Sequence, residues 1–216
     1  MKRFTLALAA AAVALGSGAQ AVPLPIGTTP LSGTTVAASP QLAGTVLEDD
    51  VVPFSFAGAS GTVTGTVQSR VVRSVDGTLD FYWRVISDDR STGTITSFRV
   101  GDFFTPVYDG NYETDGLGEV GPASARRFSG GAVNFLFGDT PASTFGPGTS
   151  SYFMFLDTQA TTYARTAIYD LTGNDTISGA YLTFAPSNVP EPGTYALLAG
   201  GLGMLALARR RRAPRA

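Results

Sequence analysis

The sequence contains no cysteine and no histidine among its 216 residues. Without cysteine the folded protein has no disulfide, so its stability must come from buried apolar surface, which a chain of this length can supply. Without histidine it lacks the Ser-His-Asp triad, the Cys-His dyad, the His-ligated zinc site and the commonest general base. Most hydrolase mechanisms are therefore excluded, and so is lipid attachment to an N-terminal cysteine.

The N-terminus has the pattern of a secretory signal peptide. Basic residues at positions 2 and 3 precede an apolar run over residues 4–15, and the small residues Ala19 and Ala21 fit the A-x-A rule for cleavage. An uncleaved membrane anchor is the alternative, but this run is too short to span the ~30 Å hydrocarbon core comfortably. We expect residues 1–21 to be removed and the mature protein to begin at Val22.

The C-terminus has three parts in a fixed order within residues 189–212. The prolines of the first part, Pro190-Glu191-Pro192, make a stiff segment that no helix should cross. The second part, residues 193–208, carries no charge and would span only about 24 Å as a helix, less than the ~30 Å core of a bilayer. The third part is a basic cluster formed by Arg209, Arg210, Arg211 and Arg212.

The basic cluster predicts the topology of this C-terminal segment. Arginines next to an apolar segment resist translocation and stay on the cytoplasmic side of the membrane. The segment should therefore hold a precursor in the inner membrane with its N-terminal side out, and residues 213–216 should form a cytoplasmic tail. An ordinary C-terminal anchor would have the same topology.

The order of these three parts resembles the PEP-CTERM sorting domain, which is found on exported proteins of Gram-negative bacteria that make exopolysaccharide. The resemblance covers residues 189–212 and shows no departure from the family's pattern. It implies a partner, exosortase, an integral-membrane enzyme similar to cysteine transpeptidases, which would cut near Pro190-Glu191-Pro192. It also implies a mature protein at the cell surface or in the extracellular matrix.

The net charge of the whole chain differs from that of the domain, because the two export segments contain many of the basic residues. Only eight of the 15 basic residues but 16 of the 17 acidic residues lie between positions 22 and 188, so this region carries a net charge of −8. An acidic surface repels phosphate backbones, which argues against a nucleic-acid partner. It favours solubility outside the cell and is compatible with divalent cations.

The region between the two export segments has the pattern of an all-β domain. Residues 22–47 are rich in Pro, Thr and Gly and predict an extended leader or a first strand, followed by a domain over residues 48–188. Strict alternation over residues 62–73 and 78–87, separated by Asp76-Gly77, predicts a hairpin with a type I′ turn. Further strands are expected at 93–104, 126–137, 151–157, 161–171 and 177–184, with a long loop at 105–122. About eight strands predict an antiparallel β-sandwich or jelly roll.

One stretch of the expected loop is a weak candidate for calcium binding. Asp109, Asn111, Glu113 and Asp115 place oxygen ligands at alternate positions, a spacing by which a loop can wrap Ca²⁺. It is not an EF-hand, because Thr114 stands where that loop needs glycine. A solvated acidic loop is the alternative, and no other cofactor is indicated.

Three functions follow for the domain. The first is a non-catalytic cell-surface or matrix protein associated with exopolysaccharide or biofilm. The second is a carbohydrate-binding module, dependent on calcium if the site above is real, in which rings on an exposed face stack on extracellular polysaccharide. The third is a glycoside hydrolase that uses two carboxylates, for which the sequence names no pair. We expect no enzyme. The rings available for stacking are Tyr82, Tyr108, Tyr112 and Tyr152.

The sorting assignment predicts the effect of removing the motif. Replacing Pro190, Glu191 and Pro192 together with alanine should leave an unprocessed precursor in the inner membrane, because the enzyme loses the segment that it recognises. Immunoblotting of membrane fractions would measure this. Normal processing of the variant would refute the assignment to exosortase.

Overall fold

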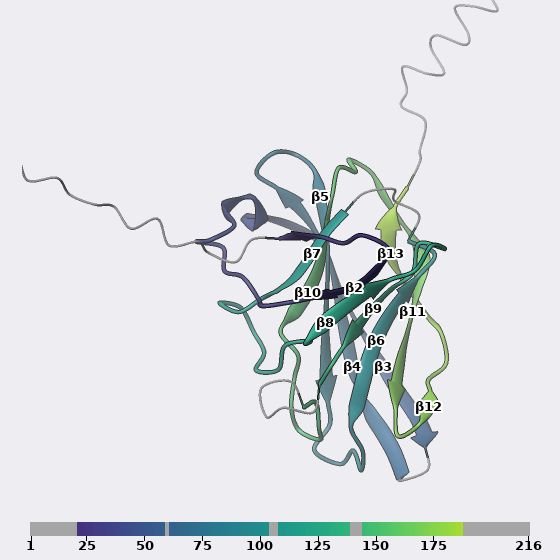
Figure 1. The fold of residues 1–216 in the computed structure, drawn as a ribbon. Coiled ribbons are helices and arrows are strands. Elements are labelled where there is room, and N and C mark those ends of the chain that lie inside the picture. Colours follow the sequence, from purple (N-terminus) through teal and green to yellow (C-terminus); the bar gives the residue numbers. More distant parts are fainter. Residues whose placement is uncertain (1–20, 59–60, 104–107, 139–143, 188–216) are drawn as a thin grey trace, which may run out of the picture.

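The computed structural model describes residues 21–58, 61–103, 108–138 and 144–187. These residues form two antiparallel sheets that pack face to face (Figure 1). The six-stranded sheet has the order β1-β7-β10-β5-β4-β3. The seven-stranded sheet has the order β12-β11-β6-β9-β8-β2, with β13 also paired to β11. The predicted all-β sandwich is therefore confirmed for the described part of the chain.

The strands are short except for β3, β4 and β5 of the six-stranded sheet and β11 of the seven-stranded sheet. In the six-stranded sheet they are β1 (Val22–Pro23), β3 (Gly44–Gly58), β4 (Gly61–Ser74), β5 (Leu79–Ser87), β7 (Tyr108–Glu113) and β10 (Phe153–Thr158). In the seven-stranded sheet they are β2 (Gly27–Pro30), β6 (Ile95–Gly101), β8 (Ser124–Arg127), β9 (Val133–Leu136), β11 (Tyr163–Gly173), β12 (Thr176–Ile177) and β13 (Tyr181–Pro186). A short 3-10 helix, η1, covers Pro40–Leu42.

The predicted hairpin is present as β4 and β5, but its turn differs from the expectation. A type I′ turn needs positive φ at both central residues, whereas only Gly77, with φ of 90°, has it. The Gly77 N–H donates to the Ser74 carbonyl and the Ser74 N–H to the Thr78 carbonyl. The connection between β4 and β5 is therefore longer than the two-residue Asp-Gly turn that the sequence predicts. It consists of a tight turn followed by a glycine in the left-handed region.

Three other predictions for the strands are wrong. The loop expected at 105–122 contains β7, which alternates less clearly than the hairpin because its polar residues face a covered surface. The strand expected at 126–137 is two strands, β8 and β9, joined by a turn. The strand expected at 177–184 is also split, into β12 and β13.

The N-terminal segment is part of the sandwich rather than a separate leader. β1 pairs with β7 in the six-stranded sheet, and β2 pairs with β8 in the seven-stranded sheet. The domain boundary expected at Glu48 falls inside β3. Residues 34–43, which we call the arm, then pass over the outer face of the six-stranded sheet before β3 begins.

The core lies between the sheets and is dominated by aromatic rings. Leu79, Phe81, Trp83 and Val85 of β5 all face inward, as the alternation predicts, and none is more than 1% exposed. Trp83 lies 6.1 Å from the rings of both Phe98 and Phe103. Its Nε1 donates to the Thr183 hydroxyl at 2.8 Å, which links β5 to β13 across the sandwich. These buried contacts therefore stabilise a fold that has no disulfide.

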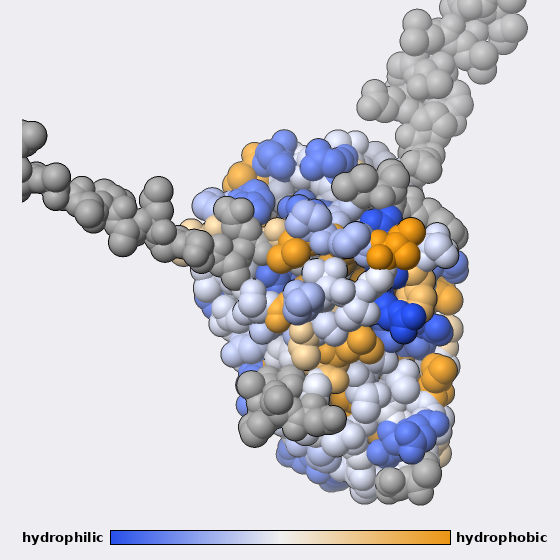
Figure 2. Space-filling model, viewed as in Figure 1, coloured by the Kyte–Doolittle hydropathy of each residue, from blue (hydrophilic) through white to orange (hydrophobic). Residues whose placement is uncertain are grey.

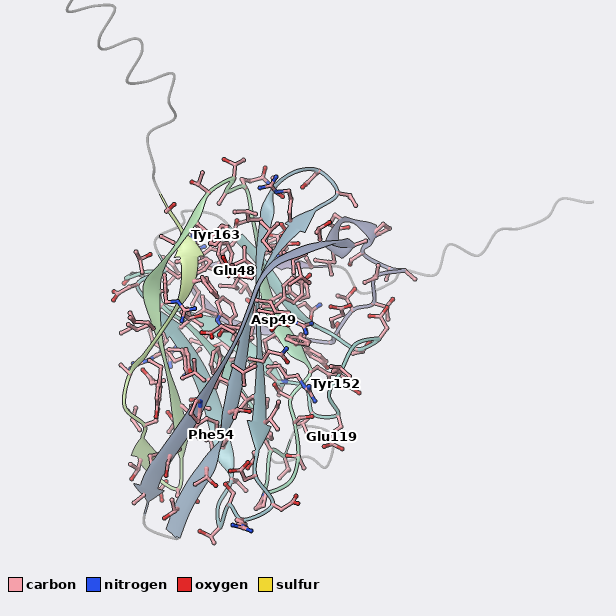
Figure 3. The ribbon with its side chains drawn as sticks, turned by 180° about the vertical axis from the view of Figure 1, so that it is seen from behind. Glu48, Asp49, Phe54, Glu119, Tyr152 and Tyr163 are labelled. Atoms are coloured by element: carbon pink, nitrogen blue, oxygen red, sulfur yellow. The ribbon has the colours of Figure 1, made fainter. Side chains whose placement is uncertain are left out.

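The long edge strand β3 carries several features that oppose pairing with another chain. It has a bulge between Val46 and Glu48 and a proline at position 53. Glu48 accepts a hydrogen bond from Tyr163 at 2.9 Å, and Figure 3 shows this pair near the upper end of the strand. Asp50 pairs with Arg165 at 2.6 Å. Charges, a bulge and a proline are the usual protections of an exposed edge.

Among the described residues on the side of the seven-stranded sheet, the visible surface shows no single large apolar patch. Figure 2 shows its apolar residues in several separate areas among polar ones. Scattered apolar residues of this kind are normal for a globular protein and need no partner to cover them. This face is therefore a weak candidate for a binding surface.

The hydrogen bond between Trp83 and Thr183 generates a prediction. Thr183→Val keeps the shape of the side chain but leaves the buried indole N–H without its acceptor. The free energy of unfolding should fall by about 1–3 kcal/mol, measured by denaturant titration. Thr45→Val, at an exposed position of β3, is the matched control. A loss no larger than that of the control would contradict the assigned role.

Candidate functional site on the outer face

The outer face of the six-stranded sheet brings chemically active side chains together. Alternate residues of β7, β10, β5 and β4 point to this face, and the strand register aligns them in rows. The first row runs from a polar side chain through two aromatic rings to an arginine and an aspartate. The second row, which we call the acidic row, contains three aspartates and a valine. In order across the sheet, the first row is Asn111, Phe155, Tyr82, Arg70 and Asp49, and the second is Asp109, Asp157, Asp80 and Val72.

The arm covers much of this face and is held there by hydrogen bonds to β7 and the residues after it. The Thr34 N–H donates to the Tyr112 carbonyl, and the Thr114 N–H donates to the Thr34 carbonyl, both at 2.8 Å. The Gly33 N–H donates to the Asn111 side chain at 3.0 Å, and the Val36 N–H to Asp115 at 2.9 Å. The arm is therefore a fixed part of the fold.

Beneath the arm lies a second apolar cluster, separate from the core between the sheets. Its buried members are Leu42, Val72, Tyr82, Phe153 and Phe155, and Ala21 packs against them. The cluster explains why residues 152–156 are apolar on both faces. Met154 and Leu156 face the core between the sheets, while Phe153 and Phe155 face the arm.

A cavity of about 370 Å³ remains between the arm and the sheet. Two charged side chains border it, Arg70 and Glu113. The Arg70 guanidinium lies 4.5 Å above the Phe153 ring and donates to Asp49 at 2.9 Å. The lining residues are Val36, Leu42, Ala43, Gly44, Val46, Arg70, Val72, Tyr82, Glu113 and Phe153.

Glu113 is directly opposite Phe153 in the pairing of β7 with β10. Burial raises the pKa of its carboxyl, and the neighbouring Asp115 raises it further, while Arg70 lowers it. Glu113 thus borders the cavity as a partly desolvated carboxyl group that can accept, and when protonated donate, a hydrogen bond.

The acidic row contains an unusual pair. Asp80 and Asp157 are directly opposite on β5 and β10, and Asp109 follows on β7. Asp80 is completely buried, and the Ser74 hydroxyl donates to it. Burial first, and repulsion by Asp157 second, raise the pKa of Asp80 to about 8, against the effect of Ser74.

A pKa of about 8 favours the protonated form of Asp80 at neutral pH, and this form can donate a hydrogen bond to the carboxyl of Asp157 directly opposite. Like charges directly opposite on neighbouring strands repel each other, and a shared proton removes this cost. A glycosidase also uses one protonated and one ionised carboxyl, but about 5–10 Å apart, with the sugar between them. Asp80 and Asp157 are direct neighbours across β5 and β10 and neither lines the cavity, so this pair gives the hydrolase hypothesis no support.

The calcium candidate has a different geometry from the one expected. Asp109, Asn111 and Glu113 lie on strand β7 and not in a loop, so their side chains are spread along an extended backbone. Asn111 is used by the arm, as is Asp115. Within the described residues, no group of three or more acidic side chains is placed to hold a metal ion. The premise of a wrapping loop was wrong, and calcium binding stays a prediction.

The rings expected to stack on sugars are not displayed on an open face. Tyr82 and Tyr108 are 4% and 2% exposed. Tyr112 and Tyr152 stack on each other, with ring centroids 5.8 Å apart. These rings therefore do not form a flat aromatic platform on which a sugar could stack. The cavity between the arm and the sheet is the remaining candidate site for a sugar.

Several predicted site residues lie outside the described residues, and the structure does not test them. They are the motif Pro190-Glu191-Pro192, the apolar segment 193–208, the cluster Arg209–Arg212 and the cleavage residue Ala19. Ala21 is described and packs on the second apolar cluster. The described chain ends at Ser187, whose N–H donates to the Thr162 carbonyl at 3.0 Å.

Comparison with known protein families decides the nature of the C-terminal segment. Residues 188–212 match the PEP-CTERM protein-sorting motif. The chain therefore carries a PEP-CTERM sorting motif at its C-terminal end. The motif marks it as an exported protein, with a membrane-anchored precursor and exosortase as its sorting partner. No curated protein and no solved structure matches the chain. In the part of the chain that the structure describes, no helix is long and apolar enough to cross a membrane.

The buried pair generates a prediction about pH. Because the pKa of Asp80 is raised to about 8 in the folded state, its proton stabilises the fold fully below the ordinary value near 4, and this contribution is lost as the pH rises toward 8. Asp80→Asn cannot ionise and should be more stable than the parent at pH 8 by about 1–3 kcal/mol.

The advantage of Asp80→Asn should shrink steadily between pH 8 and pH 4, measured by denaturant titration at each pH. Asp102→Asn, at an exposed position, is the control and should show no such trend. A stability difference between Asp80→Asn and the parent that is constant over this range would exclude a shared proton.

Proposed function

We propose that this protein is a non-catalytic component of the cell surface or extracellular matrix, delivered there by exosortase. The observation that carries the proposal is the PEP-CTERM sorting motif at residues 188–212. It directly follows β13, which ends at Pro186, so the domain is the cargo of the motif. In the precursor the domain lies outside the inner membrane, and the arginine cluster remains inside.

The chemistry of the domain supports a non-catalytic role. The chain has no histidine and no cysteine, and its most perturbed carboxyl group, Asp80, is completely buried. A catalytic acid must reach the atom that it protonates. Asp80 lies outside the lining of the cavity as well, and the acidic surface suits solubility outside the cell.

A second candidate function is the binding of carbohydrate, and the cavity under the arm favours it. Ligand sites are concave, mostly apolar and supplied with a few polar groups, as this cavity is. Calcium dependence belongs to this candidate and is tested by repeating the binding measurement with and without calcium.

The proposed function predicts where the protein is found and what it does not do. In wild-type cells the mature protein should be digested by a protease added outside, and its intact mass should correspond to a chain that begins at Val22 and ends before residue 193. In cells without exosortase it should stay in the inner membrane. Retention in the periplasm of wild-type cells would contradict the proposal.

The non-catalytic part has its own measurement. Purified protein incubated with the exopolysaccharide of its host should release no reducing sugar, with or without calcium. Release that is absent from a heat-denatured sample would establish a hydrolase. Asp157→Asn would then test whether the acidic row carries that activity.

A further inference from the structure

The cavity under the arm is built from two parts of the chain that are far apart in sequence. Its floor comes from β4, β5, β10 and β7, and its other side from the arm and the start of β3. Hydrogen bonds from residues 33, 34 and 36 hold the arm at a fixed height above the sheet. The cavity volume of about 370 Å³ is within the range of ~300–1,000 Å³ found for small-molecule sites.

The walls of the cavity differ in chemistry. Four aliphatic side chains form one part of the lining, and Phe153 lies on the floor. Glu113 is opposite Phe153 on the neighbouring strand, and the Arg70 guanidinium lies above the Phe153 ring. A molecule lying against Phe153 would therefore meet a hydrogen-bond donor and an acceptor as well as apolar surface. The aliphatic residues are Val36, Leu42, Val46 and Val72.

The charges around the cavity exclude one class of ligand. The positive charge of Arg70 is already matched by Asp49, with two nitrogens of its guanidinium at 2.9 Å from the same carboxylate oxygen. Glu113 and Asp115 add negative charge on the other side. An anion entering the cavity would meet carboxyl groups whose charge no further cation offsets, so the cavity favours a neutral ligand.

A ligand that suits this cavity is therefore a small neutral molecule that has both polar and apolar surface. A pyranose ring has this combination, because its C–H groups form an apolar side and its hydroxyls both donate and accept. We propose that the cavity binds one neutral sugar residue, with its C–H side on the aliphatic wall and its hydroxyls hydrogen-bonded to Glu113 and Arg70. This inference rests on the second candidate function above and adds the site and a preference for neutral sugars over uronic acids.

The test uses the mature protein isolated after export from its own host. Glucose, galactose and mannose are titrated by isothermal calorimetry, beside glucuronate, galacturonate and mannuronate as their acidic counterparts. At least one neutral sugar should bind saturably, and its uronate should bind at least about tenfold more weakly, a difference of about 1.4 kcal/mol. Saturation-transfer NMR should show the largest transfer to ring C–H protons.

Two variants locate the site. Ala43→Leu adds three carbon atoms to an arm residue that lines the cavity, and it should abolish binding by filling the space without changing the sheet. Glu113→Gln keeps the size of the side chain but removes a charged acceptor, and it should weaken binding about tenfold. Glu119→Gln is the matched control, because Glu119 is outside the cavity and accepts a hydrogen bond from the Ser150 N–H instead.

The outcomes separate this inference from the proposed function. Binding of no neutral sugar at millimolar concentrations, tighter binding of the uronates, or binding unchanged in Ala43→Leu would each overturn the site. Thermal melting of each variant establishes that it is folded. Processing and surface exposure, measured on the same preparations by mass and protease digestion, report on delivery and are independent of sugar binding.

Discussion

The outer face of the six-stranded sheet depends on one constraint, namely that the arm must lie across it. In a two-layer sandwich one face of each sheet meets the other sheet and the opposite face meets water. Here the arm turns part of the second face into an interior, so Phe153 and Phe155 can be apolar where a solvated strand would be polar. The carboxyl of Asp80 points to the same face of the six-stranded sheet and is desolvated there. The cavity is the space between the arm and the sheet that no side chain fills.

The covered face combines two kinds of interaction that oppose each other. Burial of aromatic and aliphatic side chains stabilises the contact between the arm and the sheet. The acidic row works against it, because Asp80 and Asp157 cannot both be ionised at such close range. The raised pKa of Asp80, about 8, limits this repulsion, because the protonated form of its carboxyl is then favoured at neutral pH.

Delivery and domain are separate in this protein. The PEP-CTERM motif matches residues 188–212, whereas the strands of the described sandwich lie between Val22 and Pro186. The motif therefore assigns the route of the protein without assigning a ligand. Evidence about the ligand has to come from the domain, and there the most specific feature is the cavity beneath the arm, bordered by Arg70 and Glu113.

The sequence by itself determined the sorting motif, the all-β class and the central hairpin, while the N-terminal signal peptide stays a prediction. The three features follow from local patterns: a proline motif before an apolar run and arginines, and period-two alternation around Asp76-Gly77. The same alternation places Trp83 on the inward side of β5 with Leu79, Phe81 and Val85, and all four are buried. Each of these features is decided by neighbours in the chain, so it needs no knowledge of distant contacts.

Only the tertiary structure decided what covers the outer face. β7 was mistaken for a loop because Asp109, Asn111 and Glu113 are polar, and nothing local reveals that they line a covered surface. The pairing of Asp80 with Asp157 joins residues 77 positions apart, and the arm reaches β7 over a similar separation. The apolar run at 152–156 was the one signal that both faces of β10 are buried. The candidate site arises from such long-range pairings, which the strand register sets and which no local pattern encodes.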